Sequence, residues 1–153
     1  MCNSRYYNYF IVILIVIILI GIGFFSVVNL NKKAKDAERI SDMTILQMAM
    51  SIIKKETGDY ASSNCSVGAI ADCAKVNNKL IEALPVLADF HDPEYQVGDA
   101  PCSSKCDINV CDYAFADIGE DDYTVYFNLQ KGVQNYEVGC YELTSKGIAK
   151  INK

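Results

Sequence analysis

Residues 10–28 read FIVILIVIILIGIGFFSVV, a run of nineteen residues without a charged side chain. Sixteen of the nineteen are Ile, Leu, Val or Phe. As a helix this run would span roughly 28 Å, about the thickness of the hydrocarbon core of a membrane. A secretory signal peptide is the alternative, but its apolar run is shorter and ends in small residues. We therefore predict a transmembrane helix over 10–28, preceded by a short N-terminal segment, 1–9.

The helical pattern continues through 29–57, which contains no proline and which we predict to be a soluble continuation of the same helix. One stripe of apolar and small residues recurs every three or four positions: Val27, Leu30, Ala34, Ala37, Ser41, Ile45, Met48 and Ile52. From residue 45 a second set widens this arc: Leu46, Ala49, Met50 and Ile53. A helix that is apolar on two sides has two partners. A single large intramolecular core is the alternative.

Position along the helix divides these residues between the two partners. Residues 34–41 lie too close to a membrane for a sheet that begins at Tyr113 to cover them, while 46–53 lie beside it. We therefore assign one face to contacts with neighbouring subunits: Ala34, Ala37, Ser41 and Ile45. A second set lies farther along and should stabilise the chain's own fold: Leu46, Met50 and Ile53. The charged residues at 33, 35, 36, 39 and 42 lie elsewhere on the wheel.

The residues after the apolar run have a recognisable order. Lys33 to Asp42 read KAKDAERISD, Leu46-Gln47-x-Ala49 follows, and Gly58-Asp59-Tyr60 closes the stretch. This order resembles the first helix of the type IV pilin and type II secretion pseudopilin superfamily. The likeness covers residues 9–60 well and the last 30 residues loosely. It implies a subunit of a helical filament, with its N-terminal helix in the filament bundle and a small sheet packed on that helix's second half.

The chain departs from that family at its N-terminus. The family's leader site reads Gly-Phe-Thr-Leu-Ile-Glu and is cut after Gly, and the Glu neutralises the new N-terminus of a neighbour during assembly. Residues 1–9 contain no glycine, the first acidic residue is Asp36, and the position of the family's Glu falls near Asn8. We therefore expect no family-type removal of the N-terminus, and polymerisation lacks its usual carboxylate.

Cysteine usage indicates an oxidising compartment. Cys2 precedes the apolar run and six cysteines follow it: Cys65, Cys73, Cys102, Cys106, Cys111 and Cys140. An even number on one side of a membrane predicts three disulfides and an exported C-terminal domain, 58–153. A domain this small needs such staples. The pairing that we expect is Cys65 with Cys73, Cys111 with Cys140 and Cys102 with Cys106.

Basic residues point to the opposite topology. Lys32, Lys33, Lys35 and Arg39 follow the apolar run, and the positive-inside rule would place the domain in the cytoplasm. There the cysteines would be zinc ligands, but they form no Cys-x2-Cys pair and His91 is the single histidine of the sequence. We favour export. From residue 31 onward 13 basic and 19 acidic residues give a net charge of −6, which disfavours nucleic-acid binding.

Three strands are predicted after the helices, over 113–116, 123–129 and 136–143, and the best of them is 123–129 because it is β-branched and aromatic. Three antiparallel strands are marginal alone, so one face should lie on Leu46, Met50 and Ile53. The sequence thus predicts an α+β fold. In it the second half of a long N-terminal transmembrane helix packs against a small antiparallel β-sheet.

Evidence for chemistry in the domain is weak. Five acidic residues form a loop-rich cluster that a solvated turn explains as well as a Ca²⁺ site does: Asp112, Asp117, Glu120, Asp121 and Asp122. We predict no other metal and no cofactor. His91 is interpreted as a turn residue, and no nucleophile is arranged for catalysis. Asn64-Cys65-Ser66 matches a glycosylation sequon, but a disulfide at Cys65 would weaken it.

These observations predict a membrane-anchored, pilin-like structural subunit of a surface filament or secretion pseudopilus, without enzymatic activity. Its expected partners are membrane lipid and other pilin-like subunits or further copies of itself. The alternative is a monomeric single-pass membrane protein that displays a pilin-like binding domain and does not polymerise. The small residues at 34, 37 and 41 favour close helix packing and hence assembly, whereas the absent glutamate favours the alternative.

Overall fold

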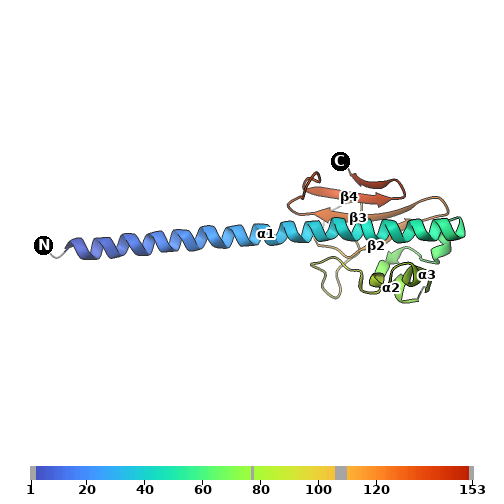
Figure 1. The fold of residues 1–153 in the computed structure, drawn as a ribbon, viewed down its shortest axis with the longest axis horizontal. Coiled ribbons are helices and arrows are strands. Elements are labelled where there is room, and N and C mark those ends of the chain that lie inside the picture. The colour runs from blue at the N-terminus through green and yellow to red at the C-terminus, as the bar shows by residue number, and fades with distance from the viewer. Residues whose placement is uncertain (1–2, 77, 106–109, 152–153) are drawn as a thin grey trace.

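The computed structural model describes residues 3–76, 78–105 and 110–151. Helix α1, Asn3–Thr57, is continuous over 55 residues, and its N-terminal half projects away from the rest of the chain (Figure 1). The most apolar 18-residue window of α1 is not buried at all. Among the described residues, α1 is the one helix long and apolar enough to cross a membrane, by length and composition. The predicted long helix is confirmed.

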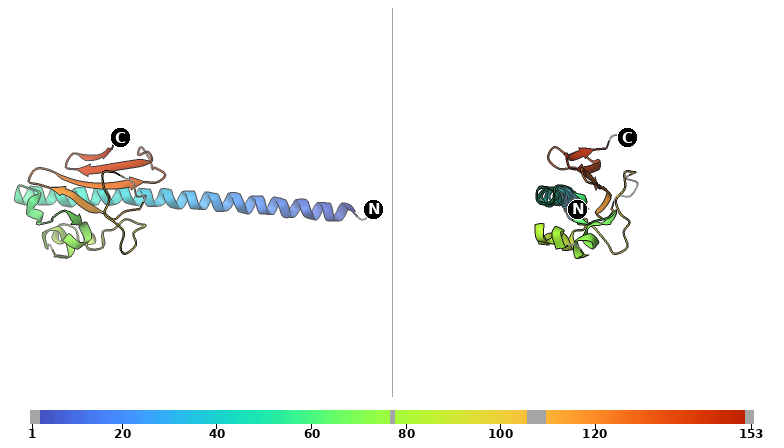
Figure 2. Two further views of the ribbon diagram at one scale, coloured as in Figure 1. Left: turned by 180° about the vertical axis from the view of Figure 1, so that it is seen from behind. Right: turned by 90° about the vertical axis from the view of Figure 1, so that its right-hand side faces the viewer.

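Helix α1 ends where the sequence places a glycine. Gly58 has φ +93° and its N–H donates to the Lys54 carbonyl oxygen at 2.9 Å. A left-handed residue of this kind caps helices and is most easily supplied by glycine. The chain then reverses and passes through four short helices: η1 (Ala61–Ser63), α2 (Ile70–Val76), α3 (Asn78–Ala83) and η2 (Pro85–Asp89). Helices α2 and α3 lie on one side of the C-terminal half of α1, and the sheet lies on the other (Figures 1 and 2).

The sheet of the described residues has five antiparallel strands in the order β1-β2-β3-β4-β5. Their bounds are Gly68–Ala69, Ala114–Ile118, Tyr123–Leu129, Gly139–Thr144 and Gly147–Lys150. The three-stranded expectation is therefore wrong in number. Strand β1 is a two-residue partner of β2, and β5 returns from β4 through a tight turn. Strand β3 has the bounds predicted for it.

The core lies between this sheet and α1, and the short helices α2, α3 and η2 also contribute to it. Strand β3 alternates, so that Tyr123, Val125, Phe127 and Leu129 are buried while the residues between them are half-buried. From the helix, five residues belong to the same cluster and are at most 2% exposed: Met43, Leu46, Ala49, Met50 and Ile53. We call these five the apolar zone of α1. The predicted packing of Leu46, Met50 and Ile53 into the protein's own fold is confirmed.

Disulfides link segments that surround the sheet and α1. The predicted Cys65–Cys73 pair is confirmed. The predicted Cys111–Cys140 and Cys102–Cys106 pairs are wrong, because Cys102 is bonded to Cys111. Backbone hydrogen bonds between the Cys102 N–H and the Asp112 carbonyl oxygen, and between the Asp112 N–H and the Ala100 carbonyl oxygen, hold these two segments side by side. Cys140 is also disulfide-bonded; Cys106 lies outside the described residues.

Candidate functional site

Two opposite faces of α1, at the level where the helix enters the globular part, are the candidate functional features. The face predicted to contact neighbouring subunits is free of the protein's own domain at three of its four positions. Ala34, Ala37 and Ser41 are exposed, and Ile45 is half-buried. Met48 continues this face and is 55% exposed. We call Ala34, Ala37, Ser41 and Met48 the uncovered face. Its role as an interface stays a prediction.

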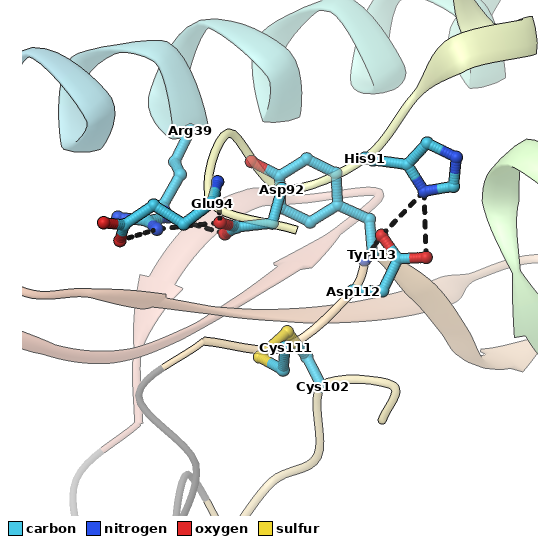
Figure 3. Close-up of a disulfide and its surroundings, with 8 residues drawn as sticks. All are labelled: Arg39, His91, Asp92, Glu94, Cys102, Cys111, Asp112 and Tyr113. Atoms are coloured by element: carbon cyan, nitrogen blue, oxygen red, sulfur yellow. Dashed lines mark hydrogen bonds and ion pairs between the residues drawn. A yellow bond between two sulfur atoms is a disulfide. The ribbon is translucent and has the colours of Figure 1, made fainter. Parts of the chain in front are cut away.

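The opposite face corrects the expectation that the domain leaves residues 34–41 uncovered. Asp36 and Arg39 are both 0% exposed. The Arg39 guanidinium points from α1 into the loop after η2, toward Asp92 and Glu94 (Figure 3). Its Nε and Nη2 donate to the two carboxylate oxygens of Asp92 at 2.6 and 2.8 Å, a bidentate pair. Nη2 also donates to Glu94 at 2.9 Å, and Nη1 donates to Asp36 at 2.8 Å.

Asp36 ties the same point of the helix to the turn between β3 and β4. Its two carboxylate oxygens accept three backbone N–H groups, those of Gln130, Lys131 and Gly132, at 3.0, 2.7 and 2.9 Å. Gly132 has φ +73°, and a Cβ there would lie 2.6 Å from the Tyr136 carbonyl oxygen. Glycine is therefore required for the turn that presents these N–H groups. We call Asp36, Arg39, Asp92 and Glu94 the ionic zone of α1.

A second layer of contacts holds the loop that supplies Asp92. His91 Nδ1 lies 3.0 Å from each carboxylate oxygen of Asp112, and its ring stacks on Tyr95 at 4.2 Å between centroids. Asp112 follows Cys111 in the sequence, so the Cys102–Cys111 disulfide restrains the backbone next to the His91–Asp112 pair (Figure 3). The interpretation of His91 as a turn residue agrees with its place in this loop.

Burial and charge shift the pKa values of the groups at this site. Burial by itself lowers the pKa of Arg39, but the hydrogen bonds and charge of Asp92, with Glu94 and Asp36, raise it above its ordinary value. Arg39 is therefore always charged. Burial raises the pKa of Asp42 to about 6, against the hydrogen bond that it accepts from the Tyr113 hydroxyl at 3.2 Å. Burial also raises the pKa of Tyr113, and the charge of Asp42 adds to that effect.

The five acidic residues considered for calcium do not converge. Asp112 is buried against His91, and Asp117 is exposed on β2. Asp121 pairs with Lys54, while the Asp122 carboxylate accepts the backbone N–H groups of Tyr123 and Ser145 at 2.8 Å each. Within 3–76, 78–105 and 110–151, no three His, Cys, Asp or Glu side chains are placed to share a metal ion.

The sequence reasoning missed the ionic zone. Its available signal was the Asp36 and Arg39 spacing of three, which places an acid and a base on one helix face, together with the acids that flank Pro93 in the turn. Neither signal indicates that Asp36 and Arg39 are buried, because the loop and the turn that cover them are 53 to 96 residues away in the sequence.

The ionic zone has a structural role. A buried arginine with three carboxylates holds only one geometry, so the zone fixes the height and rotation of the globular part on α1. Comparisons with protein-family models, curated proteins and solved structures found no match to this chain. Its function is therefore argued from its own residues.

Proposed function

We propose that this chain is a membrane-anchored, pilin-like structural subunit of a surface filament or secretion pseudopilus, with its globular domain exported and without enzymatic activity. The observation that carries the proposal is the division of α1. Its N-terminal half is apolar and free of the domain, while its C-terminal half forms one side of the domain's core. One rigid helix therefore serves as membrane anchor and as domain scaffold.

The uncovered face supports assembly through α1. It continues the exposed apolar surface of the N-terminal half, where Val27 and Leu30 are 65% and 66% exposed. Small side chains at Ala34, Ala37 and Ser41 allow the backbones of two helices to approach closely. An unbroken stripe of this kind, from the apolar half into the domain, suits a neighbouring α1 lying alongside.

Disulfides support export. Cys65–Cys73 joins the segment after η1 to helix α2, and Cys102–Cys111 closes a loop before β2. Such bonds persist outside reducing compartments. The basic residues beside the apolar run also have a structural use that does not involve topology, because Lys35 and Arg39 both bind Glu94. Their positive-inside signal is correspondingly weaker.

A second candidate is a monomeric single-pass protein that displays the same domain. The hydrogen bonding of Asp36, the first acidic residue in the sequence, favours this candidate. The Asp36 side chain is 0% exposed, and its carboxylate accepts hydrogen bonds from Arg39 and from the N–H groups of residues 130–132. Asp36 is therefore committed within the subunit and does not supply the carboxylate that neutralises a neighbour's N-terminus in the resembling family.

Crosslinking in membranes separates the two candidates. Ala37→Gln places a bulky side chain on the uncovered face and should reduce self-crosslinking several-fold, with the unfolding temperature unchanged. Ala61→Gln is the matched control, because Ala61 is an exposed alanine of η1 away from this face. Absence of self-crosslinking in the unmodified chain would leave the monomeric protein as the better account. Self-crosslinking that survives Ala37→Gln would mean that the subunits meet through another surface than the uncovered face.

A further inference from the structure

A cavity of about 700 Å³ opens beside the ionic zone, where the turn between β3 and β4 approaches α1. Three lysines from three elements line it: Lys32 of α1, Lys131 of the turn and Lys150 of β5. Asn128 and Gln130 add amide groups, and Val138 adds an apolar wall. We call this the lysine cavity. Its volume is ample for a glycerophosphate group.

Among the residues that the structure describes, two of the three lysines have no counter-charge. Lys150 pairs with Glu137 at 2.7 Å. Glu94 also lines the cavity, but its carboxylate is already bound by Lys35, Arg39 and the Gln130 amide. Within the described part of the chain, neither the Lys32 nor the Lys131 side chain has an ion pair. The lysine cavity therefore has a local positive charge, although the whole chain has a net charge of −5.

The position of the cavity along α1 determines which layer of a membrane it would face. Lys32 lies four residues beyond the last residue of the apolar run, which is about 6 Å of helix. The headgroup layer of a membrane is about 5–7 Å thick on each side of the hydrocarbon core. The backbone of residues 130–132 binds Asp36, one turn farther along, so Lys131 lies at nearly the same height. Figure 1 shows this turn at the end of the sheet nearer the N-terminal half of α1.

We propose that the lysine cavity binds the headgroup phosphate of an anionic phospholipid. Lysine ammonium groups are common phosphate ligands, and their long stems let them reach the headgroup layer from the edge of a protein. The rest of this acidic domain would be repelled by an anionic surface, so the bound lipid would hold the domain with one end toward the membrane. The proposal requires that α1 cross the membrane, but it requires neither assembly nor its absence.

Native mass spectrometry of the detergent-solubilised full chain tests this. Dioleoyl phosphatidylglycerol or dioleoyl phosphatidylcholine is added stepwise, and an apparent Kd is measured for each. Phosphatidylglycerol should bind more tightly. The double variant Lys32→Gln/Lys131→Gln should lose about five-fold in affinity for it per lysine, the usual contribution of one lysine at an anionic surface. Affinity for phosphatidylcholine should not change.

Two further variants and a competitor complete the test. Lys55→Gln/Lys146→Gln removes the same charge at the far end of the domain and should leave phosphatidylglycerol binding intact. Lys32→Arg/Lys131→Arg should retain it. Equal affinity for the two lipids, or an equal loss in the far-end variant, would overturn the proposal. Competition by millimolar glycerol 3-phosphate would also overturn it, in favour of a site for a soluble phosphate. Failure of self-crosslinking affects only the assembly proposal.

Discussion

The C-terminal half of α1 meets the rest of the chain in two adjacent zones of different chemistry. The apolar zone, from Met43 to Ile53, packs on the inner face of the sheet. The ionic zone, around Asp36 and Arg39, meets one loop and one turn through charged hydrogen bonds. Apolar burial contributes free energy in many relative orientations, whereas a bidentate ion pair is satisfied in one.

This difference suggests a division of roles along one helix. The apolar zone stabilises the domain, and the ionic zone sets its height and rotation on the helix. A subunit that packs against neighbours through the uncovered face needs both, because any rotation of the domain would alter what that face meets. Substitutions in the ionic zone, in the apolar zone and at the border between them test this division.

The largest effect is expected from Arg39→Met. It leaves Asp36, Asp92 and Glu94 without their shared cation, and breaking a buried ion pair by removing one partner typically costs about 3–5 kcal/mol. The measurement is chemical unfolding of the full chain in detergent, followed by near-ultraviolet circular dichroism of the tyrosines. Lys150→Met is the control, because its pair with Glu137 is exposed and should cost less than about 1 kcal/mol. Equal losses in the two variants would mean that the ionic zone has no special role.

Met50→Ala tests the apolar zone. Met50 is 0% exposed, so truncation leaves a cavity and should cost about 2–5 kcal/mol in the same unfolding measurement. Met48→Ala is the matched control, since Met48 lies two residues away on α1 and is 55% exposed. Its free energy of unfolding should change by less than about 0.5 kcal/mol. A large loss for Met48→Ala would show that the uncovered face also stabilises the single chain.

The two zones were not equally visible in the sequence. Leu46, Ala49, Met50 and Ile53 of the apolar zone follow from helical periodicity, and β3 follows from its alternating β-branched and aromatic residues, because each pattern is local. Met43 was in neither of the predicted apolar sets. Strand β1 was missed because Gly68 and Ala69 have no strand pattern, and their pairing depends on Phe115 and Ala114. Strand β5 was missed because its four residues do not alternate.

The ionic zone and the second disulfide were missed for a related reason. Charged residues on a helix are usually solvated, and only a distant loop and turn bury Asp36 and Arg39. Cysteine spacing did not distinguish Cys102–Cys111 from Cys102–Cys106, because both close short loops. Contacts between segments distant in sequence decided each case.

The smallest expected effect concerns Asp42, at the border of the two zones. Its pKa of about 6 in the folded protein lies above the ordinary 3.8, so the folded state holds this proton more tightly than the unfolded state does. Its contribution to stability is therefore fully present below about pH 4 and is lost as the pH rises through 6. Asp42→Asn keeps an oxygen that can accept the Tyr113 hydroxyl and removes this loss. At pH 7.5 the variant should be more stable, by about 1 kcal/mol after allowance for solvent screening at a half-buried group.

The difference between Asp42→Asn and the unmodified chain should vanish near pH 4, and thermal unfolding at several pH values measures it. Asp122→Asn is a control of opposite sign. The hydrogen bonds that the Asp122 carboxylate accepts from Tyr123 and Ser145 outweigh burial and lower its pKa, so its stabilising contribution is present at neutral pH and is lost in acid. That variant should be less stable at pH 7.5. If Asp42→Asn raised the free energy of unfolding equally at all pH values, the effect would come from packing. The buried charge of Asp42 would then not destabilise the protein.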